Sequence, residues 1–408
     1  MLAYATEISQ IAALVKCGTS HGVQPVPRNG GHHFEAFSAL NNSLVIDLSH
    51  VNYVNVASDR KSAAVGGGIR LGALYKALDA YNTTFPSGIC PTVGLTGLLT
   101  AGGFNLQQRA LGLSVDWIKA AKVVNAAGDI IPASPTENPD LFWALRGGGG
   151  GSYGIMAEVT VQTIQFPRSA MVALRWNNTD LRYPVAQRFL EWAPGTDKNF
   201  MSQVNVYKDY AQVLGWYYGK TAQEATDLMK SSGLLDIGAP LVQISGDCGT
   251  DNSRLFGYTT YTCMPDNKVN SSLLNVIPQA FAPTSSNMSL FRFDEQVKAP
   301  SVPQAPGWER FRRISKSFFV QKDRPIQNDT LKTVVDMIGQ LPAESQIWGE
   351  WHAWNISNGP YPNNSFAWRD QALAHLEFQT HGSKDPQKNN VYIQWYQKLE
   401  QLLRPALG

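Results

Sequence analysis

The sequence lacks the features that mark several large protein classes. Charged residues make up only 16% of it, the net charge is +2, and no block of like charges occurs. We therefore expect neither nucleic acid nor an anionic membrane surface as a partner. No apolar run approaches the roughly 20 residues that span a bilayer. The 43% of apolar residues instead indicate a globular protein, and 408 residues favour two domains.

Cysteine is scarce as well, with four residues in the whole chain. Cys248 and Cys263 are close enough in sequence for a disulfide across a hairpin, which would suit an oxidising compartment; two buried free thiols are an equal alternative. The first residues, Met1 to Ser9, show no signal peptide. Eight Asn-X-Ser/Thr sequons nevertheless indicate a secreted glycoprotein. They begin at Asn41, Asn82, Asn177, Asn270, Asn287, Asn328, Asn355 and Asn363.

Neither a Rossmann glycine pattern nor a P-loop is present, but three other glycine-rich segments are. The first, Arg28 to His33, reads Arg-Asn-Gly-Gly-His-His and follows a predicted strand. Consecutive glycines let backbone amides approach an anion closely, so a dinucleotide pyrophosphate would fit here. A tight turn with a basic flank is the alternative.

The second segment, residues 87–105, has five glycines among residues 88–103 and a single cysteine, Cys90. Such a stretch suits backbone lying against a ligand, and the cysteine is either a candidate nucleophile or a small buried hydrophobe. The third segment follows a helical run, Asp140 to Arg146, with five consecutive glycines and then Ser152 to Ile155.

Hydrophobic periodicity predicts an α+β fold in which helices and short strands alternate. The composition changes at Phe166-Pro167, where the glycine clusters end and aromatic residues become more frequent, and this suggests a domain boundary there. We expect helices at 7–21, 71–81, 367–378 and 391–403, and strands at 23–27, 44–48, 63–65, 119–125, 130–133, 155–161 and 212–218.

In order and spacing, the three glycine segments resemble those of FAD-linked oxidases of the vanillyl-alcohol oxidase superfamily, specifically the berberine bridge enzyme-like branch that includes fungal oligosaccharide oxidases. The resemblance is close from Ile8 to Phe166 and returns at Trp348 to Arg369. It implies a PCMH-type FAD-binding domain at 1–166 and a substrate domain at 167–360, with an antiparallel sheet covered by helices. Residues 361–408 would return as helix to the FAD domain.

The same resemblance implies that FAD is held by two covalent bonds. His32 would bond the 8α-methyl of the isoalloxazine and Cys90 its C6. His33 is off the motif and is treated as a neighbour; a metal pair of His32 and His33 is disfavoured because adjacent histidines rarely bind one ion without further ligands, so we expect no metal site. The other expected FAD contacts are Asn29, Gly30, Gly31 and His33 at the pyrophosphate, Gly88, Val93, Gly94, Thr96, Gly97, Gly102, Gly103 and Asn105 at the flavin, and Gly154, Ile155 and Val159 toward the adenine.

Two further positions bear on the reaction. Val93 stands three residues after Cys90, where a small β-branched residue is associated in the family with O2 reaching the reduced flavin. Glu350 falls where sugar oxidases of the family carry the carboxylate that takes the substrate's proton; an ordinary exposed glutamate is the alternative. Strand alternation puts Glu350 on one side with Trp348, His352 and Trp354. That face would suit stacking on a sugar or an aromatic substrate, or simple sheet packing.

The resemblance therefore predicts a monomeric, FAD-dependent oxidase that passes hydride from an alcohol or sugar hydroxyl to FAD and then to O2, giving H2O2. Its substrate would be a small molecule or an oligosaccharide. Ala101 and Asn105 replace family glycines, and we expect a chain truncated at both ends: it lacks the family's leader, which would pair with Cys17, and the closing tyrosine segment. Two alternatives stay open, namely a flavin-binding remnant with little activity and an oxidative cyclase of fungal secondary metabolism.

Overall fold

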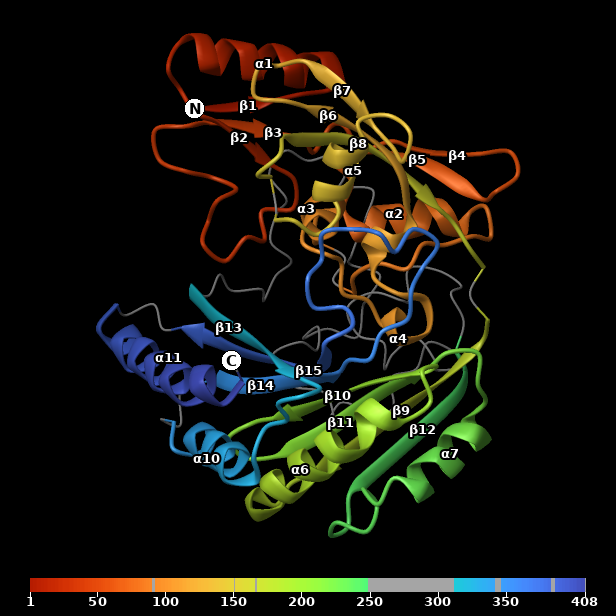
Figure 1. The fold of residues 1–408 in the computed structure, drawn as a ribbon, viewed down its shortest axis with the longest axis vertical. Helices are drawn as coiled ribbons and strands as arrows, with labels where there is room; N and C mark the ends of the chain where they lie inside the picture. Colours follow the sequence, from red (N-terminus) through yellow and green to blue (C-terminus); the bar gives the residue numbers. More distant parts are fainter. Residues whose placement is uncertain are drawn as a thin grey trace, which may run out of the picture.

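The computed structural model describes residues 1–89, 92–149, 151–165, 167–248, 312–341, 346–382 and 386–407. Its strands form three sheets, of three, five and seven strands. The two smaller sheets lie in the N-terminal half (residues 1–165), and the largest makes up the C-terminal half with its helices (Figure 1). Within the described ranges, no helix is both long and apolar enough to span a bilayer.

The three-stranded sheet is parallel, with strand order β1-β3-β2. Its strands are β1 (Leu2–Tyr4), β2 (Pro25–Arg28) and β3 (Leu44–Asp47). Helix α1 (Ile8–Ser20) covers it, because Ile11, Ala12 and Val15 recur on one side of the helix and are buried. The helix predicted at 7–21 is thus confirmed.

The five-stranded sheet has the order β4-β5-β8-β6-β7 and pairs all its strands antiparallel. Its strands are β4 (Val54–Val56), β5 (Ser62–Gly66), β6 (Ile118–Val124), β7 (Ile130–Ala133) and β8 (Ile155–Gln162). The short helices beside it are α2 (Leu71–Asp79), α3 (Leu95–Thr100), α4 (Gln108–Leu111) and α5 (Pro139–Ala144), with a 3-10 turn at Ser114–Trp117.

The seven-stranded sheet is antiparallel throughout, in the order β12-β9-β11-β10-β14-β15-β13. Its strands are β9 (Ser169–Trp176), β10 (Phe200–Val206), β11 (Ala211–Tyr217), β12 (Leu241–Cys248), β13 (Arg312–Gln321), β14 (Gln346–Ala353) and β15 (Ala372–Gly382). The chain passes from the five-stranded sheet into this one between Gln162 and Ser169.

Helices cover one face of the seven-stranded sheet, as Figure 1 shows. They are α6 (Arg182–Trp192), α7 (Ala222–Ser231), α10 (Asn328–Gly339) and α11 (Pro386–Leu407). The sheet residues that face them, among them Val204 and Trp351, form one core with Phe189 and Leu399 of the helices. Because neighbouring residues of a strand point to opposite faces, Trp348, Glu350 and His352 must face the other way, toward the N-terminal half.

The opposite face meets the N-terminal half directly. Met171 and Trp216 of the seven-stranded sheet, and Trp354 directly after β14, belong to the hydrophobic core that is centred on the five-stranded sheet. The segment after β14 adds to this contact, since Arg146 Nη1 donates to the carbonyl oxygen of Tyr361 over 2.7 Å. The two halves therefore share a buried interface.

The helix predicted at 367–378 is wrong, because most of that segment is strand β15. Ala372, Ala374, Leu376 and Phe378 are buried at every second position, which is the period of a strand. The helix predicted at 391–403 does exist within α11, but α11 packs on the seven-stranded sheet and not on the N-terminal half. The loop before β15 reaches that half, where Ser365 N donates to Arg146 O over 3.2 Å, and so does Ala372 at the start of β15, which belongs to the core centred on the five-stranded sheet.

Two of the four cysteines lie among the described residues. Cys17 is free and exposed. Cys248 is fully buried and disulfide-bonded. Cys90 and Cys263 lie outside the described residues, so the predicted flavin bond of Cys90 and the predicted pairing of Cys263 do too.

Candidate functional site

A cavity of about 610 Å³ lies in the N-terminal half, where the glycine-rich segments meet. Its wall includes β2, Leu48 directly after β3, and the start of β8. The predicted contact residues found in this wall are Asn29, Gly30, Gly31, His32, His33, Val93, Gly94, Thr96, Gly97, Gly154 and Ile155. Segments that are more than 120 residues apart in the sequence thus line one cavity.

The first two glycine segments approach so closely that only glycine fits. A Cβ on Gly30 would lie 2.3 Å from Gly94 N, and a Cβ on Gly94 would lie 2.4 Å from Asn29 Cγ. Asn29 holds this contact, since its Nδ2 donates to Gly67 O over 2.6 Å and to Thr96 Oγ1 over 3.2 Å. The backbone of these two segments therefore lines the cavity wall without intervening side chains at Gly30 and Gly94.

This wall suits the phosphates of a dinucleotide. The backbone amides of Gly30 and Gly31 donate to no other described residue, and Gly31 has a φ of 72°. Consecutive unpaired amides at such a turn form a concave site for an anion. Asn29 Oδ1 is buried without a partner among the described groups, so a ligand hydroxyl would satisfy it. The residues present therefore fit a phosphate-bearing cofactor with ribose-like hydroxyls.

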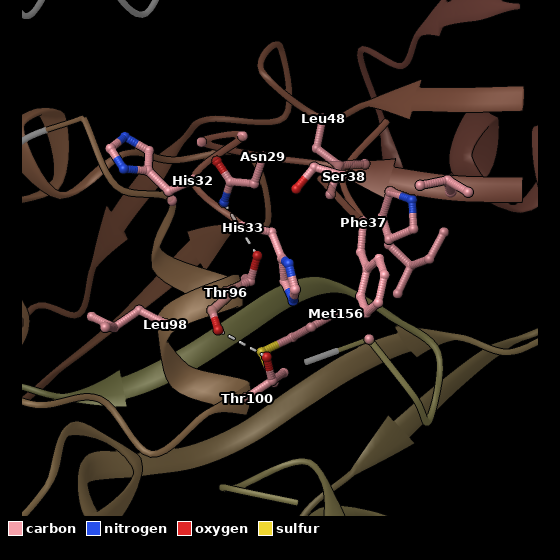
Figure 2. A pocket seen from close by; sticks show the side chains of 18 of the residues that line it. Asn29, His32, His33, Phe37, Ser38, Leu48, Thr96, Leu98, Thr100 and Met156 are labelled. Atoms are coloured by element: carbon pink, nitrogen blue, oxygen red, sulfur yellow. Dashed lines mark hydrogen bonds between the residues drawn. The ribbon is translucent and has the colours of Figure 1, made fainter. Parts of the chain in front are cut away.

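The adjacent histidines point in different directions. Figure 2 shows the His33 ring inside the cavity beside Phe37, on which it stacks with centroids 4.6 Å apart, while His32 points away. His33 Nδ1 accepts from Glu35 N over 3.2 Å, so the ring proton is on Nε2, which can donate a hydrogen bond inside the cavity. His32 Nε2 lies 3.0 Å from Thr92 Oγ1, so it contacts the second glycine segment two residues after Cys90.

Other residues expected to contact the cofactor lie outside this wall. Gly88 O accepts from Tyr75 Oη over 2.9 Å, and Gly103 O accepts from Ser114 Oγ over 2.8 Å. Asn105 is fully buried and donates from Nδ2 to Gly112 O over 3.1 Å. Gly102 packs on Phe366, and Val159 is in the core of the five-stranded sheet. These five residues have structural contacts that the sequence motifs did not reveal.

A second group of polar residues lies on the face of the seven-stranded sheet that looks toward the N-terminal half. Glu350 Oε1 is 3.1 Å from His352 Nε2, and Trp348 Nε1 donates to Glu350 Oε2 over 3.4 Å. His352 is 2% exposed, whereas the Glu350 side chain is 20% exposed. The partly exposed carboxylate of Glu350 is thus in contact with the buried imidazole of His352.

The pairing of β14 with β15 brings two more ionisable groups to this face. Glu377 is the partner of Glu350 across the two strands, and His375 is the partner of His352. His352 Nδ1 lies 3.3 Å from His375 Nδ1. We call these four residues the carboxylate–histidine cluster. His375 and Glu377 were missed in the sequence because their segment was read as helix; the alternation of buried residues along β15 was the signal available.

Burial and mutual charge set the ionisation of the cluster. Burial alone would raise the pKa of Glu350, but hydrogen bonds and charge from His352, with hydrogen bonds from Trp348 and Gln203, lower it below its usual range. Burial, and then the charge of Glu350, raise the pKa of Glu377 to about 7. Burial and then the charge of His352 lower the pKa of His375 to about 3. At neutral pH, Glu350 is therefore ionised and His375 is neutral.

The cavity and the cluster are connected through the second glycine segment. Val93 to Thr100 line the cavity, and Phe104, four residues further along, packs on His352 with ring centroids 4.5 Å apart. A cofactor that extends along this segment from the phosphate end would reach toward Glu350. The arrangement can thus hold a dinucleotide and present a carboxylate base to whatever is bound beside it.

Aromatic rings extend the face beyond Glu350. Tyr207 stacks on Trp348 with centroids 6.0 Å apart and on Tyr210 with centroids 4.3 Å apart. The guanidinium of Arg175 lies over Tyr210 at 3.9 Å from its centroid. Among the described residues, no group of three His, Cys, Asp or Glu side chains is placed to hold a metal ion.

Comparison with known proteins agrees with the geometry of the cavity. Residues 1–134 match the family model described as FAD binding domain. The chain is 55% identical over 410 residues to "FAD-linked oxidoreductase pytB" of Aspergillus terreus, covering all of this chain and 51% of that protein. It is 54% identical over 409 residues to "FAD-linked oxidoreductase pynB" of Aspergillus niger, covering all of this chain and 75% of that protein.

More distant proteins share part of the sequence or only the fold. The glucooligosaccharide oxidase of Sarocladium strictum is 35% identical over 229 residues, which are 54% of this chain and 44% of that protein. The solved structure of BBE-like 1 from Physcomitrella patens superposes with a TM-score of 0.79 at 20% identity, covering all of this chain and 81% of that one. The second likeness shows the fold alone. The chain spans about half the length of the first of these relatives and three quarters of the second.

Proposed function

Because the chain belongs to the FAD-linked oxidoreductases of the berberine bridge enzyme-like family, we propose that it is an oxidase in which Glu350 takes the proton from a substrate hydroxyl. The observation that carries this proposal is the position of Glu350. It lies partly exposed beside His352, on the sheet face that Phe104 of the second glycine segment contacts. A base must be ionised to work, and the lowered pKa of Glu350 meets that requirement at neutral pH.

We further propose that FAD is bound covalently. Gly30 and Gly31 would hold its phosphates with their amides, and His33 would donate from Nε2 beside them. His32 and Cys90 would form the two tethers, which fits the contact of His32 with Thr92. When bound, FAD accepts hydride from the substrate carbon and passes the electrons to O2, giving H2O2.

The chain's own residues orient the substrate and remove its proton. A hydroxyl placed against Glu350 would give its proton to a carboxylate oxygen as the C–H bond breaks. His352 keeps that carboxylate in one orientation by its contact with Oε1, and Trp348 does the same at Oε2. Phe104 packs on His352, and the buried Trp354 packs on His375.

For the substrate we propose a small molecule or an oligosaccharide that stacks on the aromatic rings next to Glu350. Tyr207 and Tyr210 are the half-buried members of this group, whereas Trp348 is buried behind them, and the contacting part of the substrate is a sugar or an aromatic ring. The named sugar oxidase is similar over about half of the chain, so it supports a carbohydrate only in part. We propose that the protein acts as a monomer.

Secretion is part of the same proposal, and the sequons support it. Asn41, Asn82, Asn177, Asn328 and Asn363 are exposed and could carry glycans. Asn355 is different, because it is half-buried and its Nδ2 donates to Pro194 O over 3.3 Å. Endoglycosidase treatment of protein secreted by a fungal host should lower its mass, and glycopeptide mapping should find Asn355 unmodified. An unchanged mass would contradict this part of the proposal.

Peroxide formation by the full chain tests the function. The protein is incubated with a panel of oligosaccharides and aromatic alcohols, and H2O2 is measured. With the substrate so found, Glu350→Gln should lower kcat by at least about 100-fold while the flavin absorbance stays unchanged. Glu191→Gln, at a largely exposed glutamate of α6, is the matched control and should keep the wild-type rate. A Glu350→Gln enzyme within about twofold of wild type would remove Glu350 as the base.

A further inference from the structure

Two glutamates face each other directly in the carboxylate–histidine cluster. Glu350 and Glu377 are Cα partners on the antiparallel strands β14 and β15, so their side chains leave the same face of the sheet. The Cβ atoms of such a pair are about 5 Å apart. Like charges at this separation repel, and two carboxylates sharing a site cannot both ionise easily.

The surroundings of Glu377 supply little to offset its charge. Ser315 Oγ donates to Glu377 Oε1 over 3.3 Å, and Gln379 donates from the same strand. Lys316 of β13 instead pairs with Glu400 of α11 at 2.8 Å. In the described part of the chain, no ion pair is formed by Glu377, whereas Glu350 has His352.

The histidine pair accounts for the different states of the two glutamates. His352 Nδ1 lies 3.3 Å from His375 Nδ1, and His352 Nε2 lies 3.1 Å from Glu350 Oε1. The contact with His352 lowers the pKa of Glu350, whereas burial, and then the charge of Glu350, raise the pKa of Glu377. The negative charge of the carboxylate pair is therefore placed on Glu350, and the proton on Glu377.

The other titratable groups around the pair do not change this assignment. Tyr207 and Tyr210 lie beyond Trp348 and have pKa values raised mainly by burial, so they are neutral. Arg175 lies over Tyr210. Tyr396 of α11 donates to the carbonyl oxygens of Ile314 and Phe378 from the helical side. β10 contributes only the amides of Gln203 and Asn205 beside Glu350.

We propose that Glu377 is a positioning residue that shares one proton with Glu350 across β14 and β15, so that the pair receives the proton released by the substrate hydroxyl. The proposal rests on the function given above. In the balanced step, the substrate O–H proton moves to the carboxylate of Glu350, while the electron pair of the C–H bond leaves with the hydride. Glu377 then releases its own proton to water and takes the one on Glu350. Glu350 is left ionised for the next turnover.

A measurement without substrate tests the shared proton. The unfolding temperature of the full-length holoprotein is followed from pH 5 to pH 8 for wild type, Glu377→Gln and Glu350→Gln. A carboxyl whose pKa is raised by folding destabilises the fold as pH rises from the unfolded value to the folded one. The difference between Glu377→Gln and wild type should therefore grow by about 3 °C in favour of the variant between pH 5 and pH 8.

The companion variants fix the interpretation. In Glu350→Gln, Glu377 loses its charged neighbour, so this pH-dependent destabilisation should move to lower pH. Glu400→Gln removes a partly exposed carboxyl whose pKa is lowered, and its difference from wild type should stay flat over this range. A flat difference for Glu377→Gln would overturn the shared proton, whatever the activity of the enzyme.

The pH profile of turnover is the second readout. For wild type, kcat/KM should rise about fivefold through pH 7 as the pair loses its shared proton, and Glu377→Gln should lose that step with KM within about twofold. Glu377→Asp, which keeps a carboxyl, should restore the step. A step that persists in Glu377→Gln would contradict the proposal. Full activity of Glu350→Gln would instead refute the proposed function, so the two failures are distinguishable.

Discussion

At the scale of single residues, the adjacent histidines His32 and His33 make different contacts. His32 contacts Thr92 of the second glycine segment, while His33 lies in the cavity against Phe37. The motif spacing had already separated the two, because only His32 occupies the motif position. The same spacing could not reveal that Gly103 and Asn105 hold a turn together, since glycine and asparagine serve ligands and turns equally well.

Val93 offers a test of the reaction with oxygen. It is half-buried and packs on the core beside the cavity, three residues after Cys90. Val93→Leu adds one methylene and should slow reoxidation of the reduced flavin by O2 at least about tenfold, because a branched γ-carbon fills the approach path. Val93→Ala is the control and should reoxidise as wild type does. Stopped-flow absorbance after anaerobic reduction measures both, and equal rates for Val93→Leu and wild type would contradict the oxygen path.

At the scale of elements, the sequence predicted most of the N-terminal half correctly. Residues 8–20 and 71–79 are helices, because each has a clear apolar period, and 44–47 is a strand, because it is a short run that is buried at every position. β15 was misread, since Ala, Leu and Glu favour helix when taken alone. Pairing with β13 and β14 overrides that preference. Half of the carboxylate–histidine cluster was missed for this reason.

The short helix α4 is fixed by one buried arginine. Arg109 is fully buried and donates to the carbonyl oxygens of Ala193, Phe200, Pro194 and Thr196 over 2.6 to 3.2 Å. Burial lowers the pKa of its guanidinium to about 10, so it still carries its charge at neutral pH. It thereby connects α4 of the N-terminal half to the turn before β10.

Arg109→Met should lower the free energy of unfolding by about 3 kcal/mol or more, because four buried carbonyl oxygens lose their donors. Urea denaturation of the holoprotein gives this value. Lys220→Met, at a surface ion pair with Glu224, should change it by less than about 1 kcal/mol. A similar small effect for Arg109→Met would show that these carbonyls find other partners.

At the scale of the molecule, the two halves are held together by buried charge as well as by the shared core. Asp116 is fully buried in the N-terminal half, and its carboxylate accepts from Arg369 Nη2 over 2.5 Å and from Nη1 over 2.8 Å. Asn364 Nδ2 and Gly359 N donate to the same carboxylate. The loop before β15 is thus bound to the N-terminal half, and this contact holds the sheet face in a fixed position relative to the second glycine segment.

Asp116→Asn should destabilise the protein by about 3–5 kcal/mol, because it leaves the buried Arg369 without a countercharge. Asp336→Asn breaks an exposed pair with Lys332 and should cost less than about 1 kcal/mol. Calorimetry of the two variants measures the difference. Equal unfolding temperatures for the two would refute the assignment of Asp116 as a principal connection between the halves.

The central claim is that FAD is attached to this chain through His32 and Cys90, and the mass of the denatured protein tests it most directly. We predict that the wild-type chain keeps the mass of one FAD after acid precipitation. His32→Ala and Cys90→Ala should each keep it through the remaining bond, and the double variant should lose it. A wild-type chain without added mass would contradict the claim, and so would loss of the flavin mass from either single variant.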